Sequence, residues 1–153
     1  MEEKIDIWLL GNTGLRNPNR IQEGFKAFVN SPYVGKLRGK ENEIGFMRFL
    51  NEQGIIQNEV GKDVSGSHAR KWRLMFSKNG FIYPKVKKRD GDQEELGTLD
   101  DITPFGRTFL KADTYPAVQE CYLRALSIEQ SVMPDKNSYF SPFRWILAIM
   151  LEL

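Results

Sequence analysis

One cysteine and one histidine, Cys121 and His68, are present among the 153 residues of the chain. A lone cysteine excludes an internal disulfide bond, and the two residues together cannot supply the ligands of a Cys/His zinc site. Because disulfides mark secreted proteins, this composition makes a reducing, cytoplasmic setting the default expectation.

Long apolar runs are also missing. No stretch reaches the roughly 18 apolar residues that a membrane-spanning helix needs. The N-terminus, MEEKIDIWLL, carries acids where a signal peptide needs positive charge. We therefore expect neither a membrane anchor nor secretion.

Acidic residues are absent from one long stretch. Residues 65–89 contain eight Lys or Arg and no Asp or Glu, although the net charge of the whole chain is only +2. The positive charge is therefore local, which is typical of a single surface that binds a polyanion such as nucleic acid. The alternative is an ordinary solvated face, which charge runs usually are.

Within this stretch the apolar residues predict a helix over residues 67–78 with two distinct faces. The apolar stripe consists of Ala69, Trp72, Phe76 and, at its edge, Met75. The opposite face carries the side chains expected to meet a partner: Ser67, Arg70, Lys71, Leu74 and Lys78. Asn79-Gly80 should end the helix, because both residues tolerate a left-handed C-terminal cap.

The following residues predict a hairpin and another helix. Residues 81–83 and 99–103 are expected to pair as antiparallel strands, and Thr103 with Pro104 marks a helix start. Six acids and no base lie between Asp90 and Asp101, which gives the hairpin an acidic tip. The sequence thus predicts an α+β fold that is mostly helical, a winged helix-turn-helix with a small β-hairpin wing.

The other segments predict a short strand over residues 5–10 and helices over residues 19–29, 41–53, 115–127 and 142–153. The side chains expected to point inward from these helices are Ile21, Phe25, Phe28, Ile44, Met47, Leu50, Val118, Tyr122, Ala125, Leu126, Phe143, Ile146, Leu147 and Met150. The last helix runs uncapped to Leu153, so we expect a further segment to continue the fold.

Three parts are predicted. Residues 1–38 form an N-terminal strand, loop and helix, and residues 39–113 form a winged-helix DNA-binding core. Residues 114–153 supply C-terminal helices that pack on this core.

The loop over residues 11–18, GNTGLRNP, mixes glycine with polar groups but lacks the Gly-Lys-Ser/Thr ending of a P-loop. Arg16, Asn17, Asn19 and Arg20 are residue types that bridge guanine, adenine or phosphate. For Asn17 and Asn19, capping of the next helix is an equally good interpretation.

No catalytic site is apparent in the sequence. A nuclease needs clustered acids that hold Mg²⁺, usually with a nearby lysine, and the only Glu-x-Lys lies at Glu2-Glu3-Lys4 without an upstream Asp. His68 has no obvious Ser or Cys partner, so a DNA-contacting or capping role is the better interpretation. We therefore predict no catalytic residue, no metal ligand and no cofactor in this chain.

Four runs of sequence resemble a known family: WLLGNTGLRNPNRIQEGFKAF, LRGKENEIGFMRFLNEQGI, SGSHARKWRLMFSKNGFI and LDDITPFGRTFL. Together they resemble the N-terminal portion of AlwI-type restriction endonucleases, which are type IIS enzymes related to strand-nicking endonucleases. The resemblance implies a bacterial restriction-modification protein whose N-terminal half reads DNA through winged-helix-like subdomains. It also implies a separate Mg²⁺-dependent cleavage domain, which we expect to lie outside this chain, so the resemblance alone does not assign cleavage to these residues.

The sequence therefore predicts a recognition domain that binds double-stranded DNA at a short asymmetric site, as a monomer when free, in the bacterial cytoplasm. The expected DNA-binding residues are Arg16, Asn17, Asn19, Arg20, Lys36, Arg38, Lys40, Ser65, Ser67, His68, Arg70, Lys71, Arg73, Leu74, Lys78, Lys85, Lys87, Lys88 and Arg89. The alternatives are a winged-helix transcription regulator, which a palindromic target and a stable dimer would favour, and a winged-helix protein-interaction module.

Overall fold

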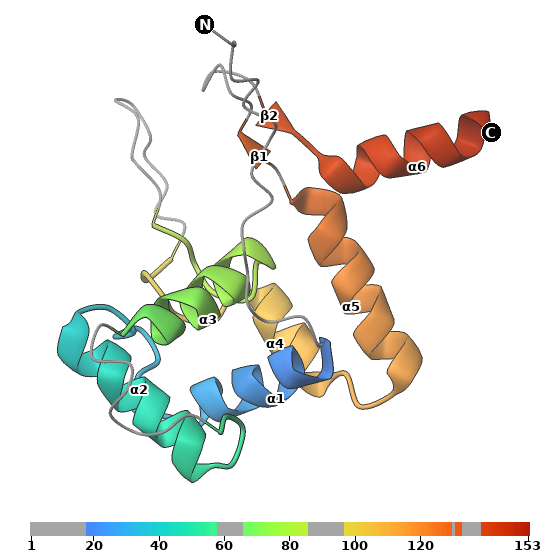
Figure 1. The fold of residues 1–153 in the computed structure, drawn as a ribbon. Helices are drawn as coiled ribbons and strands as arrows, with labels where there is room; N and C mark the ends of the chain where they lie inside the picture. The colour runs from blue at the N-terminus through green and yellow to red at the C-terminus, as the bar shows by residue number, and fades with distance from the viewer. Residues whose placement is uncertain (1–17, 58–65, 86–96, 130, 133–138) are drawn as a thin grey trace, which may run out of the picture.

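A computed structural model describes residues 18–57, 66–85, 97–129, 131–132 and 139–153 of the chain (Figure 1). The described elements are α1 (Pro18–Val29), α2 (Lys40–Glu52), α3 (Ser67–Lys78), α4 (Pro104–Lys111), α5 (Tyr115–Ile128), β1 (Ser131–Val132), β2 (Tyr139–Phe140) and α6 (Pro142–Glu152). Helices α1 to α4 pack against one another, and α5 leads from α4 to α6. The predicted strand over residues 5–10 lies outside the described residues.

Phenylalanine rings form the centre of the four-helix part. The Phe25 ring of α1 lies 5.1 Å from Phe76 of α3, 5.2 Å from Phe81 and 5.9 Å from Phe109 of α4, measured between ring centroids. Phe81 and Phe109 stack at 4.2 Å with nearly parallel planes. All four rings are fully buried, and aromatic contacts of this kind add to the free energy gained from apolar burial.

The rotation of α3 agrees with the two-faced helix predicted from the sequence. Ala69, Trp72, Met75 and Phe76 are buried, whereas Leu74 on the opposite side is 44% exposed. Trp72 lies against Gly24 of α1, where a Cβ atom would overlap the indole ring. The apolar stripe therefore docks α3 on α1, and the polar side faces outward.

Two predicted helix boundaries are confirmed. α3 ends at Lys78, and Gly80 follows with φ 72°, a left-handed conformation that glycine adopts without steric penalty. Before α4, the Thr103 hydroxyl accepts a hydrogen bond of 2.9 Å from the Gly106 amide. This is the N-cap expected from Thr103-Pro104.

The predicted fold class, an α+β winged helix-turn-helix, is wrong. Residues 81–83 and 100–103 do run antiparallel, and the amides of Tyr83, Asp100 and Thr103 donate across the pair to Asp101, Tyr83 and Phe81. Among the described residues this pairing amounts to the isolated bridge Ile82↔Ile102 and forms no strand. It cannot extend past Thr103, because α4 begins at Pro104 and Thr103 caps it. The return segment is thus a short stretch that leads into a helix, and the expected wing tip at residues 86–96 lies outside the described residues.

The strands that are described lie elsewhere and are very short. β1 and β2 pair antiparallel between α5 and α6, with Ser131 opposite Phe140 and Val132 opposite Tyr139. Two-residue strands add little to a fold of this kind. The described part of the chain is therefore a helical structure.

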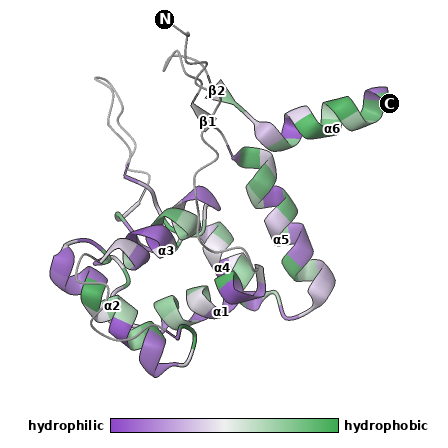
Figure 2. Cartoon of the chain, viewed as in Figure 1, coloured by the Kyte–Doolittle hydropathy of each residue, from purple (hydrophilic) through white to green (hydrophobic). Residues whose placement is uncertain are grey.

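The C-terminal helices pack less than their sequences predicted. Tyr122 of α5 contacts Phe109 of α4 edge-on at 5.3 Å, whereas Leu126 is 38% exposed. α6 contacts α5 and points away from α1 to α4, and none of its residues is buried. Its expected inward residues Ile146 and Met150 are 48% and 66% exposed, and Figure 2 shows the mostly hydrophobic colour of this helix. The predicted three-part division at residues 38 and 113 stays a prediction.

Truncation of Trp72 should destabilise the protein. Trp72→Ala removes a ring that is 3% exposed and leaves a cavity between α3 and α1, so the free energy of unfolding should fall by roughly 3–5 kcal/mol. Denaturant unfolding measures this value. Leu74→Ala, on the outward face of the same helix, is the matched control and should change it by no more than about 0.5 kcal/mol; similar losses for both variants would contradict the observed rotation of α3.

The thiol of Cys121 should react slowly in the folded protein. Cys121 is 5% exposed, and burial, assisted by the neighbouring Glu120, raises the pKa of the thiol. A smaller fraction is therefore thiolate at pH 8, and the thiolate is the reactive form. Alkylation by iodoacetamide should be at least about tenfold slower than in the urea-unfolded chain, and equal rates would show that α5 is not packed as described.

Candidate nucleic-acid interface

The outward face of α3 carries the cations that the sequence singled out. α3 contains no acidic residue, and Arg70, Lys71 and Leu74 are exposed on one side of it. Ser67 and Lys78 lie on the same face and are half-buried. This face is therefore positively charged with one apolar side chain at its middle.

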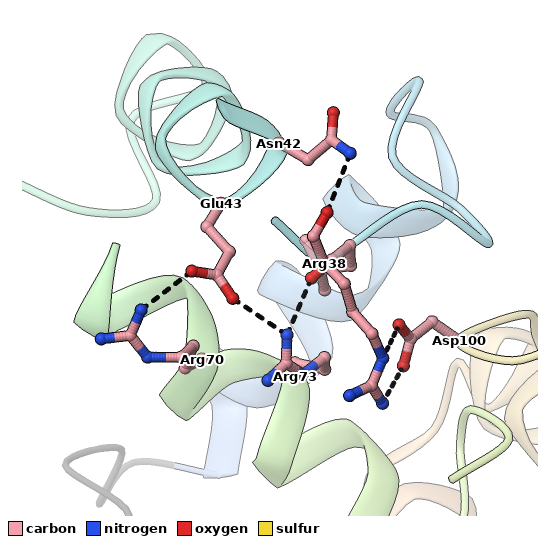
Figure 3. A network of polar contacts seen from close by, with 7 residues as sticks. Arg38, Asn42, Glu43, Arg70, Arg73 and Asp100 are labelled. Carbon is pink, nitrogen blue, oxygen red and sulfur yellow. Dashed lines mark hydrogen bonds and ion pairs between the residues drawn. The ribbon is translucent and has the colours of Figure 1, made fainter. Parts of the chain in front are cut away.

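A buried carboxylate fixes two of the arginines. Glu43 of α2 has a side chain that is only 7% exposed, and its two oxygens accept hydrogen bonds from two different guanidinium groups. Arg70 Nη1 lies 2.9 Å from Glu43 Oε2, and Arg73 Nη1 lies 3.0 Å from Oε1 (Figure 3). Arg73 Nη1 also donates to the Leu37 carbonyl at 3.0 Å. The three charged groups join α2 to α3 along the seam between these helices.

The charges of this cluster do not cancel. Two guanidinium groups share one carboxylate, so the cluster of Glu43, Arg70 and Arg73 keeps one net positive charge. The Arg73 side chain is 17% exposed and the Arg70 side chain is 46% exposed. Of the two arginines, Arg70 is therefore the more exposed, and it lies beside Lys71.

Arg38 belongs to a second, neutral pair. Its Nε and Nη2 donate to the two carboxylate oxygens of Asp100 at 2.7 and 2.9 Å (Figure 3), the two-pronged geometry that guanidinium and carboxylate favour. Asp100 is 1% exposed and has φ 60°, and its backbone bonds to Tyr83 and Gly35. This pair joins the segment before α2 to the segment before α4, and it leaves little charge for an external anion.

The structure distributes the predicted DNA-binding residues over several positions. Ser67, His68, Arg70, Lys71, Leu74 and Lys78 lie together on α3. Lys78 Nζ forms an ion pair at 3.5 Å with Oε1 of Glu129, the residue after α5. Lys36 and Lys40 are exposed around the start of α2, Asn19 and Arg20 are exposed in the first turn of α1, and Lys85 is exposed after α3. Arg38 and Arg73 are bound internally. The residues outside the described part are Arg16, Asn17, Ser65, Lys87, Lys88 and Arg89.

The sequence interpretation missed the two acids that organise these cations. Glu43 is in phase with the buried residues Phe46, Met47 and Leu50 of α2, and an acid on an apolar face indicates a buried charge that needs a partner. This signal was available. Asp100 was assigned instead to the acidic tip of the wing, and nothing in its local sequence indicates burial.

Two features are absent from the described residues. No group of three or more His, Cys, Asp or Glu is close enough there to hold a metal ion. No helix in the described ranges is long and apolar enough to cross a membrane.

Comparison with known protein families gives one match. The model of the AlwI restriction endonuclease family matches residues 77–153, just over half of the chain. The chain belongs to this family. In this AlwI-family protein the matched part begins in the last turn of α3 and contains α4, α5 and α6. The match supports the predicted AlwI type, and the assignment to the N-terminal portion of the family stays a prediction. Restriction endonucleases act on DNA, so the family implies DNA as a partner.

Two further comparisons are negative. Neither the curated proteins nor the solved structures contain a significant match to the AlwI-family chain. The assignment to the family therefore comes from the family model.

Removal of the Glu43 carboxylate should destabilise the fold of this AlwI-family chain. Glu43→Ala leaves the largely buried Arg73 guanidinium without its anionic partner, and an uncompensated charge of this kind, partly reached by water, should lower the free energy of unfolding by about 1–3 kcal/mol. Thermal or denaturant unfolding measures the change.

The matched control is Glu120→Ala. Glu120 is paired with Arg124 on the surface of α5, where both side chains are more than half exposed, so its loss should change stability by no more than about 0.5 kcal/mol. Equal effects for the two variants would mean that the cluster between α2 and α3 is only a surface ion pair.

Proposed function

We propose that this AlwI-family chain binds double-stranded DNA through the outward face of α3 and serves sequence recognition in a restriction or nicking endonuclease. The observation that carries the proposal is the arrangement of Arg70 and Lys71 on an acid-free helix face, with one net positive charge at the Glu43 cluster. Family membership supplies the class of partner.

The face has the residue types that base recognition needs. An α-helix fits the major groove of B-DNA, where Arg donates two hydrogen bonds to guanine and an apolar side chain contacts the thymine methyl group. Arg70 and Leu74 are adjacent on the outward side of α3 and supply these two types. They are therefore the residues we assign to base contacts.

Lysines around this face supply the less specific contacts. Lys71 is exposed on α3 and makes no polar contact within the described part of the chain. A lysine in that setting pairs with phosphate and positions the protein without reading sequence. Lys36, Lys40 and Lys85 are exposed in neighbouring segments and are assigned the same role. We assign Arg38 and Arg73 to the fold and not to DNA, because their guanidinium groups are bound internally.

We further propose that one chain binds one short asymmetric site. Recognition of such a site needs no two-fold symmetry, whereas a dimer with matched half-sites would read a palindrome. We also propose that binding needs no cofactor. Selection from a pool of random duplexes, in a buffer containing EDTA, would identify the site and test both statements.

Salt titration tests DNA binding directly. The purified chain should bind a duplex of about 30 base pairs. The logarithm of its affinity should fall linearly with the logarithm of salt concentration, with a slope of about 0.9 for each phosphate neutralised. Fluorescence anisotropy between about 50 and 200 mM salt covers the useful range. Absence of binding at the lowest salt would contradict the proposal.

Lys71→Ala should weaken binding to every duplex alike and reduce the salt slope by about one. Lys26→Ala is the matched control, because Lys26 is an exposed lysine on α1 rather than α3. The control should leave affinity and slope unchanged. If both variants lose affinity equally, binding depends on the total charge of the protein, and α3 is not the binding face.

A further inference from the structure

We infer that Glu43 is a positioning residue for DNA recognition: it holds the Arg70 guanidinium at the edge of α3 in one orientation before DNA arrives. This inference rests on the proposed function, because it assigns the bound orientation of Arg70 to contact with a base. Glu43 itself lies too deep to touch DNA, since its side chain is 7% exposed.

The carboxylate is itself held from two sides besides Arg70. Arg73 binds Oε1 and is anchored in turn on the Leu37 carbonyl. Gly66 closes the other side, since a Cβ atom there would lie 2.8 Å from Glu43 Cβ and 2.9 Å from Oε2. With little room to rotate, Oε2 stays directed at Arg70 Nη1, 2.9 Å away.

A held arginine binds more tightly than a free one if its charge survives. Ordering a flexible side chain on binding weakens affinity by about 2- to 10-fold, and a side chain ordered in advance avoids most of that loss. The competing effect is neutralisation by the carboxylate. Here Glu43 is shared with Arg73, so the carboxylate neutralises Arg70 less than it would in a one-to-one pair.

Arg38 shows the contrast. It is ordered by Asp100 just as firmly, but in a one-to-one pair whose charges cancel. Order alone therefore does not make an arginine suitable for DNA. The two-to-one ratio at Glu43 distinguishes Arg70 from the other paired arginine at this seam.

A double-mutant cycle tests the inference. Glu43→Gln, Arg70→Ala and the double variant are compared with the wild type for affinity to a duplex recovered by selection from a random pool. Glu43→Gln also removes a negative charge, which by itself favours DNA in both backgrounds. The affinity change that it causes should therefore be about 2- to 10-fold less favourable when Arg70 is present than when Arg70 is Ala. Equal changes in both backgrounds would show that Glu43 acts only through the fold and would overturn the inference.

A matched control and a second measurement complete the test. Glu120→Gln, which removes a charge from the exposed pair on α5, should leave affinity unchanged. If Glu43→Gln does not fold, the NMR order parameter of Arg70 Nε in the wild-type protein decides: a value near 0.85, as for rigid groups, supports the inference, and a value below about 0.6 overturns it. If the wild type binds no duplex, the proposed function itself is refuted. If the wild type binds but the cycle shows no coupling, only the role of Glu43 is refuted.

Discussion

The buried carboxylate of Glu43 is the interaction on which the described structure most depends. Among the described residues it is the acid buried in the seam between α2 and α3, and it compensates Arg73, whose side chain is only 17% exposed. Its second oxygen holds Arg70 at the surface. A single side chain thus stabilises the packing of two helices and sets the position of a surface cation, so stability and the candidate interface are coupled through it.

Helix positions were predictable from sequence to a large extent, and the fold class was not. The apolar period of α1 and α3 and the Thr103 cap of α4 are local signals, and the structure confirms them. The wing was a non-local prediction. Residues 81–83 and 99–103 have strand-like sequences and share backbone hydrogen bonds, but α4 begins directly after Thr103 and limits the pairing, which the pattern of apolar residues does not show. The prediction that the apolar residues of α6 point inward was wrong for a related reason. The apolar period of this helix is clear, but periodicity does not say which surface would cover it.

The candidate site was predictable in its cations and not in their pairing. The acid-free stretch marked α3, and Arg70 and Lys71 do lie on its outward face. Counting charge along the chain could not show that Arg38 is neutralised by Asp100, because their partnership spans 62 positions in sequence. The set of candidate binding residues is therefore smaller than the sequence indicated. Arginines that are bound within the fold are separated from cations that are exposed at the surface.

The most direct test of the account is to map the DNA-binding surface residue by residue. Backbone amide NMR shifts would be recorded for the chain alone and with a saturating amount of a duplex of about 20 base pairs, which spans about two helical turns. The account predicts that the largest shifts fall on α3 around Arg70, Lys71 and Leu74, with α6 unaffected. Shifts concentrated on α6, or an unperturbed α3 in a protein that binds DNA, would contradict it.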